Sequence, residues 1–192
     1  MRNVTLWMVG LAITAFLGTS VASAADYEYI GLKKCSMCHK KDATGNQLAK
    51  WEAGPHAKAF EVLASEKSLA EAKKMGIDNP QAEPKCLKCH VTAFPVMADL
   101  ANQKITLEEG VSCESCHGPG SGYYKKKVMA DIRAGTVEAA SVGLIEPTEE
   151  TCLGCHGPDP NNPFHKDFDF KTAVEKIAHP IPEGASSAGD DE

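Results

Sequence analysis

The sequence Cys-x-x-Cys-His occurs four times in this chain of 192 residues, and the four copies use all eight of its cysteines. In chain order the first to fourth motifs are Cys35, Cys38 and His39; Cys86, Cys89 and His90; Cys113, Cys116 and His117; and Cys152, Cys155 and His156. In such a motif two thioethers attach a c-type haem and the histidine ligates its iron. The pattern therefore predicts four covalently bound haem c groups, and a mainly α fold whose short helices and loops wrap around them.

Two other uses of paired cysteines fit the pattern poorly. Two C-x-x-C pairs can form a closed zinc site of four thiolates, but such a site does not require a histidine after every second cysteine. The chain has seven histidines, and four such followers would arise by chance with a probability on the order of 10⁻⁶. Dithiol redox pairs of the thioredoxin kind do not repeat with trailing histidines either. The sequence favours haem attachment over both.

The first residues predict export. Arg2 and Asn3 give a positive start, residues 4–17 are apolar, and Ala22-Ser23-Ala24 is a small-residue cleavage site. We therefore expect a signal peptide at 1–24, because its apolar run is shorter than the about 20 residues of a membrane span. Residues 25–182 would then form the tetrahaem domain and 183–192 a disordered acidic tail. The expected location is periplasmic, and an extracellular one is compatible with the same signal.

The charge balance limits the partners. The chain has 26 acidic and 20 basic residues, a net charge of −6. This excess argues against nucleic acid and predicts a redox partner with a basic face, or one that tolerates salt. Residues 125–127, all lysine, form the longest basic run. A solvated helix face is its ordinary interpretation, and contact with haem propionates or with a partner is the alternative.

Helix signals between the motifs predict three further helices. The first covers 55–76, from a proline to a glycine. The second covers 121–135, with the serine at its start as a candidate N-cap. The third covers about 170–178, before a His-Pro pair that disfavours further helix. Residues 94–112 predict an irregular segment with a short strand at 104–106.

The motif histidine fills one axial position of each iron, so four distal positions need ligands. Neutral imidazole is a strong haem ligand, and we expect the three remaining histidines to serve as distal ligands. These are His56, His165 and His179. One iron is then left for methionine, water, an empty position or a ligand from another chain. The methionines outside the motifs and the signal peptide are Met75, Met97 and Met129.

Several stretches resemble the tetrahaem cytochrome c-554 family. They are residues 33–40 (Lys-Lys-Cys-Ser-Met-Cys-His-Lys), 54–60 (Gly-Pro-His-Ala-Lys-Ala-Phe), 86–94 and 110–120. The resemblance covers most of the chain, from about residue 30 to residue 182. It implies a mainly α-helical fold with closely stacked haem pairs. It also implies three haems with two histidine ligands each and one five-coordinate haem.

The same resemblance assigns some ligands. The five-coordinate haem would be that of the second motif, and His56 and His179 match distal ligands of the family. The family's remaining distal histidine falls where this chain has Tyr124, Lys125 and Lys126. His165 is then the candidate replacement.

The leading functional hypothesis is a periplasmic electron carrier with no catalytic residues of its own. It would accept electrons from a multihaem or quinol-linked dehydrogenase and pass them to a membrane or soluble cytochrome. In the resembled family the donor is a hydroxylamine oxidoreductase-like enzyme of ammonia oxidisers. We expect a monomer that binds no nucleic acid and has no membrane span once the signal peptide is removed.

Two alternatives stay open at this point. An open haem would suit reduction of nitric oxide or nitrite. Against it, no histidine is left as a distal proton donor, and no motif is the Cys-x-x-Cys-Lys variant of nitrite reductases. The chain would otherwise be a subunit of an extracellular cytochrome filament, with a distal ligand donated by a neighbouring chain.

Overall fold

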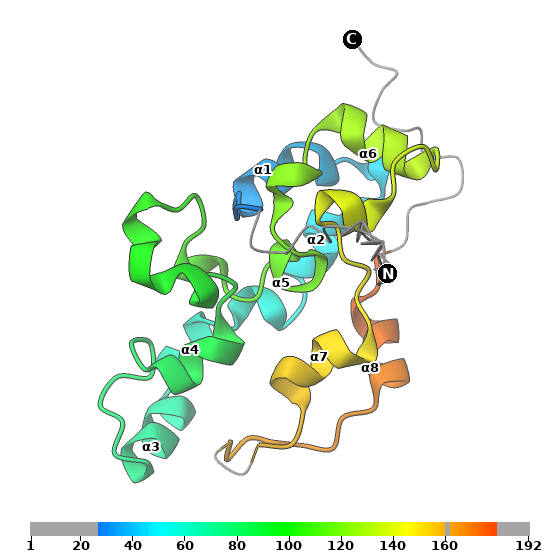
Figure 1. Ribbon diagram of the computed structural model, residues 1–192. Helices are drawn as coiled ribbons and strands as arrows, with labels where there is room; N and C mark the ends of the chain where they lie inside the picture. Colours follow the sequence, from blue (N-terminus) through cyan, green and yellow to red (C-terminus); the bar gives the residue numbers. More distant parts are fainter. Residues whose placement is uncertain (1–26, 160–161, 180–192) are drawn as a thin grey trace, which may run out of the picture.

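The computed structural model describes residues 27–159 and 162–179, and this part of the chain consists of short helices joined by loops (Figure 1). The described part contains no β-strand, so the prediction of a mainly α fold is confirmed. The predicted signal peptide (1–24) and acidic tail (183–192) lie outside the described residues. The end of the predicted tetrahaem domain, residues 180–182, lies outside them as well.

The α-helices of the described part are five to nine residues long. They are α1 (Leu32–His39), α2 (Gln47–Glu52), α3 (Glu66–Lys74), α4 (Pro84–His90), α5 (Cys113–His117), α6 (Lys126–Arg133), α7 (Glu149–His156) and α8 (Phe170–Ile177). Short 3₁₀ helices connect them, at Asp42–Thr44, His56–Lys58, Glu61–Ala64, Phe94–Asn102, Leu107–Glu109, Gly120–Gly122 and Ala139–Val142. Isolated helices of this length are marginal in water, so their stability must come from what they pack against.

Each of the four Cys-x-x-Cys-His motifs forms the end of an α-helix. The helices α1, α4, α5 and α7 all end at the motif histidine. Helical geometry places residues three and four positions apart on the same face. The two cysteines and the histidine of each motif are therefore presented to one side of their helix, where a single macrocycle can meet all three.

The predicted helix over 55–76 is broken into three shorter helices. Two 3₁₀ helices, His56–Lys58 and Glu61–Ala64, precede α3. The break falls at Ser65, whose backbone is extended (φ −68°, ψ 151°) and whose hydroxyl accepts a hydrogen bond from the amide of Ser68 at 3.2 Å. This serine is an N-cap inside the apolar pattern, so the prediction of one continuous helix was wrong.

The predictions for the later segments had mixed outcomes. Ser121 does not cap a helix; its hydroxyl accepts a hydrogen bond from the amide of Glu28 at 2.8 Å, and α6 begins only at Lys126. The predicted strand at 104–106 is wrong, since in the described structure this segment is a loop between two 3₁₀ helices. The helix predicted at about 170–178 is confirmed as α8.

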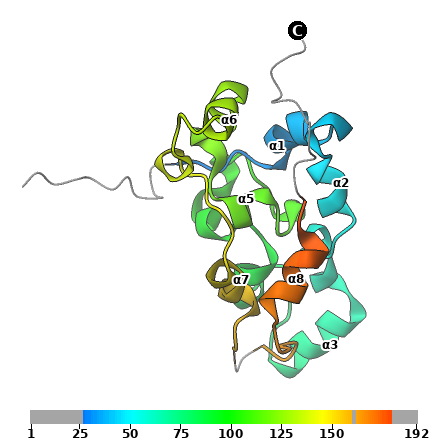
Figure 2. The same cartoon turned by 90° about the vertical axis from the view of Figure 1, so that its right-hand side faces the viewer.

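The helices are distributed along an elongated body. In both views α1 and α6 lie at one end, α5 in the middle, and α3 at the other end (Figures 1 and 2). The hydrophobic core of the described residues is small, with Leu63, Leu87 and Val91 at its centre and Phe60 and Met97 packed against them. So small an apolar centre is what we expect where haems supply much of the interior.

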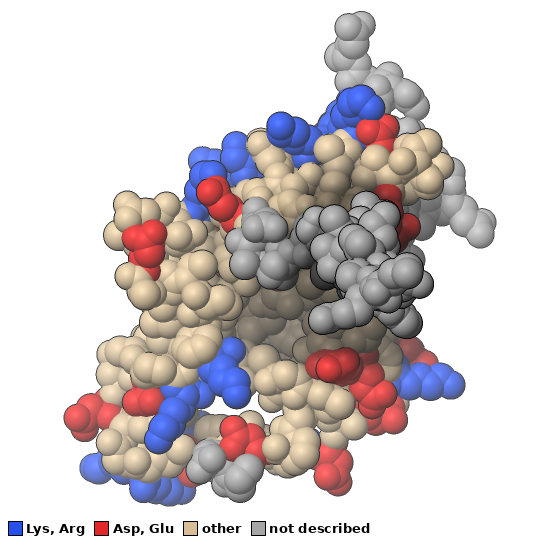
Figure 3. Space-filling view, viewed as in Figure 1, with Lys and Arg blue, Asp and Glu red and all other residues tan. Residues whose placement is uncertain are grey.

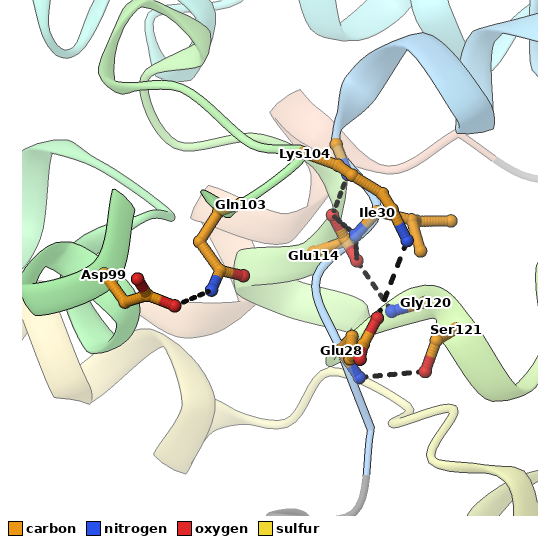
Figure 4. Close-up of polar contacts among 9 residues, drawn as sticks. Glu28, Ile30, Asp99, Gln103, Lys104, Glu114, Gly120 and Ser121 are labelled. Carbon is orange, nitrogen blue, oxygen red and sulfur yellow. Dashed lines mark hydrogen bonds and ion pairs between the residues drawn. The ribbon is translucent and has the colours of Figure 1, made fainter. Parts of the chain in front are cut away.

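One carboxylate fastens the segment before α1 to the third motif. Glu114 lies between the two cysteines of that motif and is 2% exposed. It accepts hydrogen bonds from the backbone amides of Ile30, Gly31 and Gly120 at 3.0, 2.8 and 2.6 Å (Figure 4). A buried carboxylate is tolerated only with such partners. These contacts hold the start of α1, and with it the first motif, beside the third.

Candidate haem-binding sites

The four motif helices lie in two neighbouring pairs. The helix α1 contacts α5, and α4 contacts α7. These contacts bring Cys35 of the first motif close to Cys113 of the third, and Cys89 of the second close to Cys155 of the fourth. The first and third motifs are thus neighbours, and so are the second and fourth.

Three of the motif histidines have an oxygen acceptor at Nδ1. The contacts are His39 to Oε1 of Gln47 (3.1 Å), His90 to the carbonyl of Ala59 (2.5 Å), and His117 to the carbonyl of Ile145 (3.3 Å). A ring that donates its Nδ1 proton to such an acceptor keeps the lone pair of Nε2 available for a metal. These contacts therefore leave Nε2 of all three rings free to bind a metal.

Two of the predicted distal histidines face motif histidines. The ring centres of His56 and His156 are 6.1 Å apart, and those of His179 and His117 are 5.9 Å apart. An iron between two imidazoles would place the ring centres about 6 Å apart, since each nitrogen lies about 2 Å from a metal and each ring centre about 1 Å beyond it. Burial lowers the pKa of His56, His117 and His156, which favours the neutral rings that metals bind. The residues present fit haem iron at both places.

The chain is similar to known cytochromes over most of its length. Residues 34–118 match the family model described as cytochrome c554 and c-prime. The chain is also 33% identical over 159 residues to cytochrome c-554 of Nitrosomonas europaea, a match that covers 76% of this chain and 65% of that protein. This chain belongs to the cytochrome c-554 family. No solved structure matches it.

Membership of the cytochrome c-554 family implies covalently bound haem c. The match to the family model ends at residue 118 and so includes three of the motifs. The fourth is built in the same way, at the end of a helix that Thr148 caps by accepting a hydrogen bond from the amide of Thr151. Among the described residues no group of three or more His, Cys, Asp or Glu side chains is placed to hold a metal ion. The described helices are also too short or too polar to cross a membrane.

The residues before the third motif hold His56 in place. The carbonyl of His56 accepts a hydrogen bond from the amide of Val111 at 3.1 Å, and the indole of Trp51 donates one to the carbonyl of Val111 at 2.8 Å. Gly110, at φ +60° and ψ −139°, passes so close that a Cβ there would lie 2.8 Å from the carbonyl oxygen of His56. Only glycine adopts this positive φ readily and also lets the backbone pass so close to the carbonyl of His56. The approach to the third motif therefore positions the histidine that faces the fourth.

The other candidate ligands have different surroundings. His39, His90 and His165 face no histidine ring among the described residues. Met97 is half-buried and packs against the core around Leu87, as an ordinary core methionine does. Met75 is 43% exposed at the end of α3. Met129 is half-buried on α6.

Sequence reasoning missed three residues that support the sites: Gln47, Gly110 and Glu114. Gln47 is identified only by its contact with His39, and nothing in the local sequence marks it. Gly110 and Glu114 lie inside the stretch 110–120 that resembles the family, but their roles depend on segments distant in the chain. A glycine three residues before a haem motif was the one available signal, because glycine marks close backbone approach.

Proposed function

We propose that this cytochrome carries four haem c groups, one at each motif, and acts as a periplasmic electron carrier. When bound, haem c supplies a one-electron couple between ferric and ferrous iron. The observation that carries the proposal is the pairing of the motif helices, α1 beside α5 and α4 beside α7. It keeps the attachment sites adjacent in pairs, as electron transfer within one molecule requires.

At two of the sites, the facing histidines support electron transfer rather than coordination of a substrate to the iron. His56 faces His156, and His179 faces His117. A histidine on each side of an iron leaves no position for a substrate to coordinate. It also keeps the potential below that of a site with one methionine ligand. These four residues would therefore hold their irons as low-potential, coordinatively closed centres.

The compartment and the partners are part of the same proposal. Residues 1–24 would direct export, and residues 25–182 would carry the haems in the periplasm. The donor would be a multihaem or quinol-linked dehydrogenase, such as a hydroxylamine oxidoreductase-like enzyme, and the acceptor a membrane or soluble cytochrome. The protein would act as a monomer.

Haem content and redox behaviour test the proposal directly. The chain is produced in a host that attaches haem c and is examined by intact mass spectrometry and by spectroelectrochemical titration. We expect the mass of residues 25–192 plus four haems, and four reversible one-electron steps. Fewer than four attached haems would contradict the proposal. Sustained turnover of nitrite or nitric oxide by the reduced protein would favour a reductase instead.

A further inference from the structure

All seven histidines of the chain lie among the described residues, so each of them can be placed. Four form the two facing pairs. His39 and His90 remain as motif histidines without a facing histidine, and His165 remains as the last candidate ligand. Two irons therefore have one histidine between them, and its position decides which iron it can serve.

His165 lies at the end of the molecule away from the first motif. The segment that joins α7 to α8 is far from α1 in both views (Figures 1 and 2). Within it, His165 lines a cavity of about 300 Å³ together with Cys155 and His156 of the fourth motif. Its backbone amide donates to the carbonyl of Asn162 at 3.1 Å, which helps to hold the loop in this place.

The fourth motif already has a facing histidine, and its neighbour is the second motif. His56 faces His156. The helix α7, whose Cys155 lines the same cavity as His165, contacts α4, which carries Cys89 and His90 of the second motif. The iron within reach of His165 that lacks a histidine is therefore the one bound by His90.

We propose that His165 serves the iron of the second motif, and that the open iron is that of the first motif, held by His39. This inference rests on the proposed four-haem content. The family resemblance assigned the open position to the second motif; the placement of His165 reverses that assignment. The first-motif iron then forms a binding site for small ligands, with Gln47 on the ring's Nδ1 side.

The surroundings of the first motif favour anionic ligands. We define the basic face as Lys33, Lys34, Lys40, Lys41, Lys125, Lys126 and Lys127, all of which are exposed. Lysine and arginine gather over α1 and α6 at this end of the molecule, whereas acidic side chains cluster near α7 and α8 (Figure 3). Clustered like charge raises the local concentration of opposite charge. In an acidic protein, this basic face would therefore favour the approach of a small anion such as azide or nitrite to an open iron at the first motif.

Electron paramagnetic resonance of the oxidised holoprotein tests the number of open irons. We expect one high-spin ferric haem in four, which cyanide converts to low spin. His165→Ala should raise the number of high-spin haems to two, because the second-motif iron loses its ligand. A wild-type protein with no high-spin haem, or with two, would overturn the proposal. So would a His165→Ala spectrum identical to that of the wild type.

A crystal structure of the cyanide complex of the wild-type protein tests the location without any variant. We expect cyanide on the iron bound by His39. Cyanide on the iron bound by His90 would overturn the assignment. If intact mass confirms four haems and cyanide binds elsewhere, only this inference fails; if the haem count is lower, the proposed function fails first.

The role of the basic face is tested with azide as the anion. Replacing Lys125, Lys126 and Lys127 by glutamine should weaken azide binding about threefold at low salt and flatten its salt dependence, since exposed charges act weakly and are screened. The matched control replaces Lys73, Lys74 and Lys85, which are exposed on α3 and α4, and should leave azide binding unchanged. Equal losses in both variants would exclude a local effect of the basic face.

Discussion

Replacing Glu114 by alanine should destabilise the protein by about 3–5 kcal/mol. The carboxylate accepts three hydrogen bonds from backbone amides, and its side chain is 2% exposed. Each buried donor that loses its partner costs about 1–3 kcal/mol. The total stays below the simple sum because the desolvation penalty of the buried charge disappears with it. Most proteins have only about 5–15 kcal/mol of stability, so the change would be a large part of it.

Two further variants separate the contribution of the carboxylate from that of general packing. Glu114→Gln keeps one acceptor oxygen but turns an amide group toward backbone donors, so we expect about half of the alanine effect. Ser121→Ala removes the single hydrogen bond to the amide of Glu28, at an exposed position. It should cost about 0.5–1 kcal/mol.

The assay is guanidinium unfolding of the oxidised holoprotein, followed by circular dichroism after mass spectrometry has verified equal haem content. The free energies of unfolding should rank wild type, Ser121→Ala, Glu114→Gln and Glu114→Ala from most to least stable. A loss for Glu114→Ala within about 1 kcal/mol of wild type would refute the reasoning. It would mean that water satisfies the amides of Ile30, Gly31 and Gly120, and that the carboxylate does not fasten α1 to the third motif.

Three further substitutions test a candidate ligand, a close backbone approach and a half-buried carboxyl group. His179→Ala should convert one low-spin haem to high spin and raise the reduction potential of that haem. An unchanged electron paramagnetic resonance spectrum would show that His179 is not a ligand. Gly110→Ala should cost about 3 kcal/mol or more, because its Cβ would meet the carbonyl of His56. The control Gly76→Ala, at φ +71° with open space around it, should cost about 1 kcal/mol, and equal denaturation midpoints would contradict the clash. Burial raises the pKa of Glu109 above its ordinary 4.5, so wild type should lose stability as the pH rises from that value through the raised pKa. Glu109→Gln should lack this decline in its unfolding midpoints between pH 4 and pH 7, and parallel curves would exclude the effect.

The sequence was most informative where the chemistry is local. A haem motif spans five consecutive residues, so the attachment sites could be predicted without knowledge of the fold. The facing histidines were harder to predict, because His56 and His156 are a hundred positions apart in the chain. The composition supplies the candidate distal ligands, whereas the motif that each candidate faces depends on the path of the loops between the helices.

Errors in the predicted helices have a common physical cause. A serine hydroxyl can cap a helix or accept a hydrogen bond from a distant backbone amide with similar energy. Which of the two occurs depends on which amide the tertiary structure places beside the hydroxyl. Ser65 caps α3 with the amide of Ser68, whereas Ser121 meets the amide of Glu28 instead. Both serines looked alike in the sequence. The strand expected at 104–106 failed for a related reason, since no neighbouring segment offers it a ladder in the described structure.

The small apolar core has a consequence for how the protein is made. With Leu63, Leu87 and Val91 at its centre and no described α-helix longer than nine residues, the chain without haem has little to hold it together. Covalent attachment of haem would therefore complete folding as well as supply the redox groups. Chains that stay incompletely loaded with haem would remain open to proteases, and only fully loaded molecules would persist. The amount of this cytochrome in the cell would then follow the supply of haem and of the attachment machinery more closely than the rate of its synthesis.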